Sequence, residues 1–160
     1  MNREARLRLA WCGLHPDRLR QLIEQRGPDT AVLRDIVAGR IDAAPRIRAA
    51  AETGTDAILA RLRESGAEPV FRSDAGYPEH LALLPDAPDV LFVKGALPAA
   101  PGVAVVGTRK STVYGRGLAR AYGKAIAAAG WPLVSGLARG IDGEAHRGTV
   151  SGGGIGVAVL

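Results

Sequence analysis

The alternation of apolar runs and helix-forming stretches from residue 103 onwards constrains the fold most. Apolar runs lie at 103–107 (VAVVG), 131–136 (WPLVSG) and 154–160 (GIGVAVL), separated by helical stretches at 114–130 and 142–150. This strand–helix–strand–helix–strand order predicts a parallel sheet with right-handed crossovers, as in Rossmann-like α/β folds. Because VAVVG is continuously apolar, we expect that strand to be buried on both faces of the sheet.

The preceding segment supplies more extended chain. Strands are expected at 68–73 (EPVFRS) and 89–95 (DVLFVKG), with a brief helix from about Pro78 between them and a Pro/Gly connector after them. We therefore assign residues 67–160 to one Rossmann-like, mostly parallel domain. Three parallel strands rarely form a whole layer, so this sheet is expected to be truncated, incomplete at its C-terminal end.

Residues 1–66 predict a small helical domain. The expected helices span about 3–12, 16–25, 30–38, 43–53 and 56–65, and glycines separate them. Apolar residues recur at helical spacing, with arginines mostly on the opposite faces. Helix-hairpin-helix-like modules of this size bind DNA backbones, but most small helical bundles only pack against a neighbour, and both interpretations stay open.

Composition excludes several protein classes. The hydrophobic content of 47% is too high for a disordered tail. No apolar run is long enough to span a bilayer, and the charged N-terminus does not resemble an export signal. Cys12 is the single cysteine, so no internal disulfide can form. These features predict a cytoplasmic protein that does not enter membranes.

The positive charge gathers in the segment of the parallel sheet. Residues 103–160 hold seven basic and two acidic side chains, which gives +5, the same as the net charge of the whole chain. A field of this kind favours an anionic partner such as nucleic acid, although modest positive charge also serves solubility alone.

The first glycine turn follows the strand at 103–107. Gly107 ends the strand and Thr108, Arg109 and Lys110 follow before the next helix. Ligands of parallel sheets bind at this carboxyl edge, where helix N-termini point unpaired N–H groups at anions. We expect Gly107 to let the backbone approach a ligand and Arg109 to grip a phosphate. The alternative is an ordinary turn with exposed basic residues.

The second glycine turn, SGLARGIDGEAHRG, begins at Ser135 and should lie beside the first. Arg139 would then border the same crevice. Tyr114, next to the first turn, is expected either to stack on a base or to anchor the helix start in the core. Together the two turns give the candidate DNA-binding residues, which are Gly107, Thr108, Arg109, Lys110, Ser135, Gly136, Arg139 and Gly140.

Catalysis and cofactor binding have weak support. Asp142 and His146 lie four residues apart on one helix, and Ser135 occupies no nucleophile elbow. We expect Asp142 to cap the helix and His146 to be a buried ring, both supporting the loop. Cys12 and the other histidines lack metal-ligand spacing, and neither a dinucleotide fingerprint nor a P-loop is present, so no metal and no cofactor are expected.

Four stretches in the second half of the chain resemble the DNA-processing protein A (DprA, or Smf) family. They are GYPEHLALLPDAPDVLFVKG, VAVVGTRKSTVYG, VSGLARGIDGEAHRG and GGGIGVAVL, in family order across about residues 76–160. The helical residues 1–66 are similar to the sterile-alpha-motif-like (SAM-like) domain that precedes this fold in many members.

The resemblance implies an extended Rossmann fold that binds single-stranded DNA, protects incoming strands and loads the RecA recombinase in natural transformation. It implies no enzyme activity and a homodimer when full length. The family's DNA-pocket arginine falls on Arg109. The family's loop motif falls on Ser135, Gly136, Ala138, Gly140, Asp142 and His146.

Two other functions stay open. Lysine-decarboxylase-like phosphoribohydrolases share a related fold and hydrolyse nucleotides, but their Pro-Gly-Gly-x-Gly-Thr turn and following glutamate are missing from SGGGIGVAVL. A module that binds an acidic protein through its basic face is the second alternative.

Overall fold

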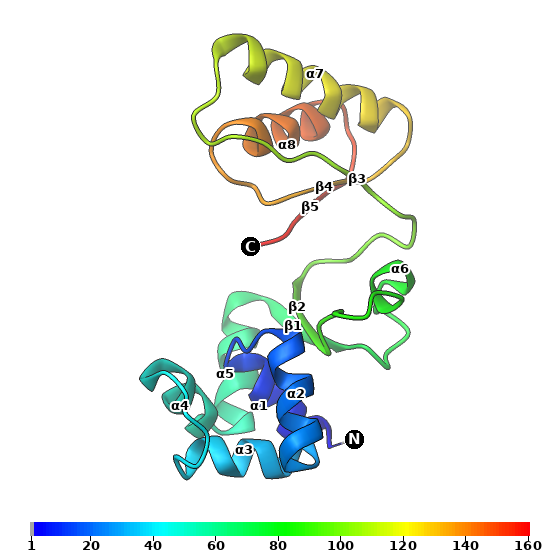
Figure 1. Ribbon diagram of the computed structural model, residues 1–160. Coiled ribbons are helices and arrows are strands. Elements are labelled where there is room, and N and C mark those ends of the chain that lie inside the picture. Colours follow the sequence, from blue (N-terminus) through cyan, green and yellow to red (C-terminus); the bar gives the residue numbers. More distant parts are fainter. Residues whose placement is uncertain (1) are drawn as a thin grey trace. The chain divides into compact units, whose positions relative to one another are not determined.

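The computed structural model describes residues 2–160, which divide into a first unit ending at Ala96 and a second unit, Leu97–Leu160 (Figure 1). The helices and strands of each unit follow the apolar patterning of the sequence closely, and most of the predicted bounds differ from the observed ones by one or two residues.

The first unit begins with a helical bundle. Its helices are α1 (Arg3–Trp11), α2 (Pro16–Arg26), α3 (Asp29–Val37), α4 (Pro45–Glu52) and α5 (Thr55–Ser65). Asn2 caps α1 by accepting a hydrogen bond from the Ala5 amide, and proline occupies the first turn of α2 and of α4, where its missing N–H costs nothing. Leu9, Val32 and Ile36 are fully buried at the centre of the bundle.

An antiparallel pair of strands completes the first unit. These strands are β1 (Ala67–Phe71) and β2 (Val90–Lys94), and a short helix, α6 (Glu79–Ala82), lies between them. The sequence placed both strands with the parallel sheet, but they form a separate sheet that packs on α1 and α5. Arg6 of α1 explains part of this docking because its guanidinium pairs with Asp29 of α3 and with Asp89, just before β2.

The second unit contains the predicted parallel sheet. Its elements are β3 (Val103–Ala104), α7 (Val113–Ala128), β4 (Leu133–Ser135), α8 (Ile141–Ser151) and β5 (Gly156–Ala158). The strands lie in the order β3-β4-β5 and every pairing is parallel, which confirms the expected strand–helix alternation.

Close packing joins α7 to α8, which lie together on one side of the strands (Figure 1). A Cβ atom on Gly123 of α7 would lie 2.1 Å from the Ala145 carbonyl oxygen, and one on Gly148 of α8 would lie 2.1 Å from the Arg120 carbonyl oxygen. Thr149, also fully buried, donates a hydrogen bond to the Gly123 carbonyl at 3.2 Å. The two backbones therefore approach more closely than any side chain would permit.

The expectation that the strand at 103–107 is buried on both faces is wrong. Val103 is 38% exposed and Val106 is 76% exposed. Since both crossover connections place their helices on the same side, the other face of the sheet carries no helix within the described residues of the second unit. Among the described residues, a continuously apolar strand is thus covered by helices on only one face of this sheet.

Across residues 2–160, none of the helices combines the length and the apolar character that crossing a bilayer would require.

Candidate nucleic-acid interface

Two loops meet at the carboxyl edge of the parallel sheet, as the sequence predicts. The β3–α7 loop and the β4–α8 loop are joined by backbone contacts, since the Ile141 amide donates to the Thr108 carbonyl at 3.3 Å. Within the first loop the Lys110 amide donates to the Thr108 hydroxyl oxygen, and Thr112 caps α7 by accepting from the Gly115 amide. These contacts hold both loops in fixed positions beside each other.

Two glycines make this loop contact possible. A Cβ on Gly107 would lie 2.6 Å from the Cβ of Ile141, and a Cβ on Gly140 would lie 2.3 Å from the Thr108 carbonyl oxygen. Gly140 also has φ of +95°, which favours glycine. Close approach to Ile141 thus accounts for the glycine at position 107, and its close approach to a ligand stays a prediction.

Asp142 does not cap α8, contrary to expectation. The N-cap position is Gly140, and no side chain closes the helix there. The Asp142 carboxylate, which is buried, instead accepts a hydrogen bond from the Gly107 amide at 3.0 Å. This contact ties the first turn of α8 to the β3–α7 loop, and so helps to set the separation of the two loops.

Ser135 of β4 and His146 of α8 are both buried at the carboxyl edge of the sheet. The Ser135 hydroxyl donates to the Val105 carbonyl at 2.6 Å and so joins the end of β4 to the residue after β3, and Ser135 is 3% exposed. The His146 ring is buried, with Nε2 3.5 Å from the Ser135 carbonyl and Nδ1 packed against Gly156. Neither the histidine nor Asp142 is bonded to the serine hydroxyl among the described residues, so they form no catalytic triad.

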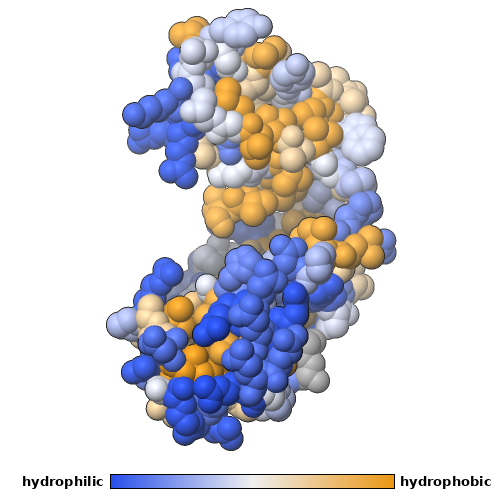
Figure 2. Space-filling model, in the orientation of Figure 1, coloured by the Kyte–Doolittle hydropathy of each residue, from blue (hydrophilic) through white to orange (hydrophobic). Residues whose placement is uncertain are grey.

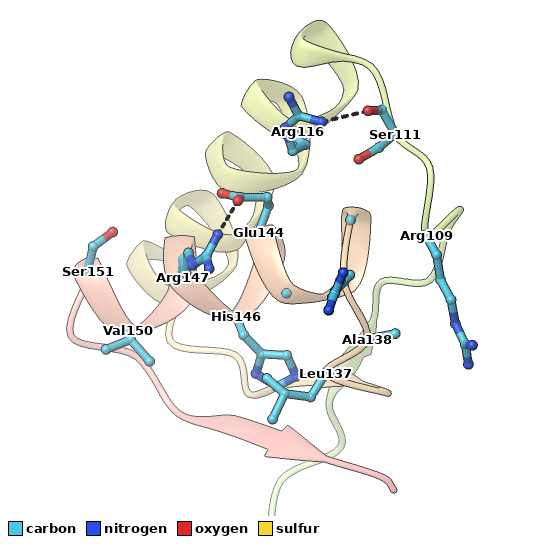
Figure 3. A pocket seen from close by; sticks show the side chains of 13 residues that line it. Arg109, Ser111, Arg116, Leu137, Ala138, Glu144, His146, Arg147, Val150 and Ser151 are labelled. Carbon is cyan, nitrogen blue, oxygen red and sulfur yellow. Dashed lines mark hydrogen bonds and ion pairs between the residues drawn. The ribbon is translucent and has the colours of Figure 1, made fainter.

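A groove of about 870 Å³ opens between the two loops and along α8. Figure 3 shows the side chains that line it, with Arg109 on one loop and the Leu137–Ala138 segment on the other. Figure 2 shows hydrophilic side chains gathered on the left edge of the second unit, where Figure 1 places these loops. The lining residues are Arg109, Ser111, Arg116, Leu137, Ala138, Arg139, Gly140, Gly143, Glu144, His146, Arg147, Val150 and Ser151.

Some of the arginines in the groove form ion pairs within the protein, and others do not. Arg147 pairs with the buried carboxylate of Glu144, and Arg120 of α7 donates to the same carboxylate at 2.9 Å. The hydrogen bond from Arg120, followed by that from Arg147, lowers the pKa of Glu144 below its usual value. Within residues 2–160, Arg109 and Arg139 make neither an ion pair nor a side-chain hydrogen bond, so both remain available to an external anion.

The structure separates the predicted site residues into three groups. Arg109, Arg139, Gly140 and His146 line the groove. Lys110 is exposed but lies outside the lining, and Tyr114 is 78% exposed, so it does not anchor the helix start in the core. The remaining predicted residues, Gly107, Thr108, Ser135, Gly136 and Asp142, do not line the groove. Ser135 and Asp142 are buried, whereas Gly107 and Thr108 are exposed on the first loop.

Sequence reasoning missed the wall that α8 contributes. The lining residues Gly140, Gly143, Glu144, Arg147 and Ser151 stand at positions i, i+3, i+4, i+7 and i+11, which lie on one helix face. That periodicity was present in the sequence and would have extended the predicted site along the helix.

Leu137 is the unusual residue of the groove. Its φ is +54°, and it is the one described non-glycine residue with positive φ. A left-handed conformation costs an ordinary side chain about 1–2 kcal/mol. Leu137 recovers little of this by burial because it is 50% exposed.

No cluster of three or more histidine, cysteine, aspartate or glutamate side chains capable of holding a metal ion occurs in the part of the chain that is described.

Comparison with known proteins decides the family. Residues 68–160, from β1 to the last residue shown, match the family model of DNA recombination-mediator protein A. The chain belongs to this family. The match spans both glycine turns and the groove-forming helix α8.

Individual DprA proteins agree with the assignment. The chain is 38% identical to the DNA processing protein DprA of Bacillus subtilis over 106 residues, which are 64% of this chain and 36% of that protein. It is 42% identical to protein Smf of Escherichia coli over 86 residues, which are 52% of this chain and 23% of that protein. The chain thus spans about a third or less of these curated relatives.

A solved DprA structure shares the fold. The X-ray structure of DNA processing protein A from Streptococcus pneumoniae matches with a TM-score of 0.65 and 27% identity, over 95% of this chain and 55% of that one. The comparisons favour the DNA recombination-mediator family over the nucleotide-hydrolysing alternative.

Proposed function

We propose that the groove at the carboxyl edge of the parallel sheet binds single-stranded DNA. The observation that carries the proposal is the pair of cations, Arg109 and Arg139, which face one groove from two adjacent loops and have no partner within residues 2–160. Each guanidinium can hold a phosphate through two N–H donors. Membership of a recombination-mediator family supports DNA as the anionic partner.

The framework behind the groove suits binding without reaction. Asp142, Ser135 and the two close-packed glycines fix the loops, so little conformational freedom is lost when a strand binds. Ser135, a predicted contact of the strand, is then assigned to this framework. Gly107, Thr108 and Gly136 also support the loops, and Lys110 adds positive charge next to the groove.

The wider role follows from the resemblance and applies to the whole protein. It protects incoming single strands in the cytoplasm, helps to load RecA during natural transformation, and acts as a homodimer when full length. The helical residues 1–66 correspond to the SAM-like domain in this proposal. The DNA-processing names of the relatives support it.

Fluorescence anisotropy with a labelled oligo-dT tests the proposal. Binding should weaken with salt along a log–log slope of about −0.7 per neutralised phosphate, and Arg109→Ala or Arg139→Ala should each flatten that slope by about one contact. The matched control is Lys124→Ala, which removes an exposed positive charge from α7 outside the groove and should leave the slope nearly unchanged. Binding that ignores salt, or variants at both arginines that bind as the parent does, would overturn it.

A further inference from the structure

Leu137 places an apolar side chain in the groove, and an apolar side chain cannot bind phosphate. It lines the same groove as Arg109 and Arg139, and half of its surface is exposed there. Phosphate oxygens gain nothing from a branched aliphatic group. Base faces and the thymine methyl group are the apolar surfaces of a nucleic acid, and in single strands they are free to meet an apolar side chain.

The backbone at Leu137 is held in its left-handed conformation from both sides. On one side, the Ser135 carbonyl accepts from the Val159 amide at 3.0 Å. On the other side, the Ala138 carbonyl accepts from the Gly143 amide at 2.9 Å. Glycine is the residue that tolerates φ of +54° without strain, yet a leucine occupies the position. Strained residues maintained in this way gather at sites of ligand contact.

Other apolar and aromatic side chains near the loops do not offer this contact. Tyr114 is exposed in the first turn of α7, but it is not among the residues that line the groove. Val150 lines the groove near the end of α8, beyond Arg147 and away from Arg109 (Figure 3). Leu137 is therefore the large apolar group that the two loops contribute to the groove, which Arg109 and Arg139 also line.

We propose that Leu137 is the base-contacting residue of the groove, and that it packs against unpaired bases while Arg109 and Arg139 hold the flanking phosphates. The inference rests on the proposed function and adds that the bases and the phosphates are bound by different residues. Because paired bases are stacked inside a duplex, this contact favours single strands over double strands.

The test compares two strands that share a backbone. One is oligo-dT of about 20 nucleotides, and the other is an abasic strand of equal length, which keeps the phosphates and lacks the bases. Anisotropy titrations of the full chain and of Leu137→Gly are run on both. The parent should bind oligo-dT more tightly than the abasic strand. Leu137→Gly should weaken oligo-dT binding about fivefold, from the lost burial of half a leucine, and leave abasic binding and the salt slope unchanged.

The control variant is Ile155→Ala, which removes exposed apolar surface from the loop before β5 and should change neither titration. Leu137→Gly should melt at the same temperature as the parent or higher, because glycine relieves the positive φ. A marked drop in melting temperature would instead show that the leucine packs for stability, and would overturn the inference.

The remaining outcomes separate the two proposals. A parent chain that binds both strands equally, or a Leu137→Gly variant that loses affinity for both or for neither, overturns the role of Leu137 and leaves single-strand binding intact. A parent chain that binds neither strand overturns the proposed function and this inference with it.

Discussion

The carboxylate of Asp142 accepts a hydrogen bond from the backbone amide of Gly107 at 3.0 Å. This contact joins the start of α8 to the loop after β3 across 35 residues of sequence. It links the loop that carries Arg109 to the helix that follows Arg139, and both arginines line the groove of the proposed DNA site.

Removal of the Asp142 carboxylate should therefore cost stability as well as affinity. Asp142→Ala leaves the Gly107 amide without its partner, and we expect a loss of about 1–3 kcal/mol in the free energy of unfolding. Asp142→Asn keeps an acceptor oxygen in place and should lose less than half as much. Urea unfolding followed by circular dichroism measures both variants, and equal losses would contradict the role of the hydrogen bond.

The Ser135→Ala variant tests whether Ser135 supports the loops or contacts DNA directly. Its hydroxyl donates to the Val105 carbonyl and is buried, so the variant should lose about 1 kcal/mol of stability and bind oligo-dT as the parent does. The two measurements are thermal unfolding and anisotropy at a temperature where both proteins are folded. A several-fold loss of affinity without a loss of stability would return Ser135 to the group of direct DNA contacts.

Replacing a glycine of α7 by alanine should change stability according to the space around that glycine. Gly123→Ala places a methyl group against the Ala145 carbonyl and should destabilise the protein by about 1–3 kcal/mol through overpacking. A Cβ on Gly117, in the same helix, would meet no atom within 4 Å, so Gly117→Ala should stabilise the protein by up to about 1 kcal/mol. Opposite signs in denaturant midpoints are the expected result, and a shared sign would show that the helices are packed differently.

Glu144 should give the protein a measurable acid sensitivity. Hydrogen bonds from Arg120 and Arg147 lower its pKa in the folded state, so the unfolded chain binds more protons at acid pH. The stabilisation is complete above the usual value of 4.5 and is lost as pH falls through the lowered pKa. Glu144→Gln should therefore show a smaller loss of stability on acidification than the parent, in urea titrations at successive pH values.

The same variant also tests the groove. Without the Glu144 carboxylate, Arg147 is released toward the groove, so oligo-dT should bind a few-fold more tightly at neutral pH. Glu64→Gln, which changes the charge equally on α5 and removes no ion pair among residues 2–160, is the control for net charge and for acid stability. If both variants bind DNA alike, the effect belongs to overall charge and not to Arg147.

The sequence by itself determined the local elements and their order. Apolar periodicity and glycine punctuation place the helices of residues 1–66 within about two residues of their observed bounds, and the 103–160 alternation specifies parallel strands. Such features depend on neighbours a few positions away, which is what a linear pattern records. The same local pattern places the glycine turns that carry Arg109 and Arg139 after the first two of these strands.

Tertiary structure alone decided how the loops are held and which side chains remain free. The Asp142 carboxylate bonds to the Gly107 amide instead of capping its own helix. The two strands before residue 96 pack with the helical unit, and Glu144 forms an ion pair with Arg147 but not with Arg139. These outcomes depend on distances between residues that are remote in sequence, and a hydrogen bond or ion pair forms only where folding brings its partners within about 3 Å. The positive φ of Leu137 has the same origin, because backbone bonds on both sides impose a conformation that leucine does not choose.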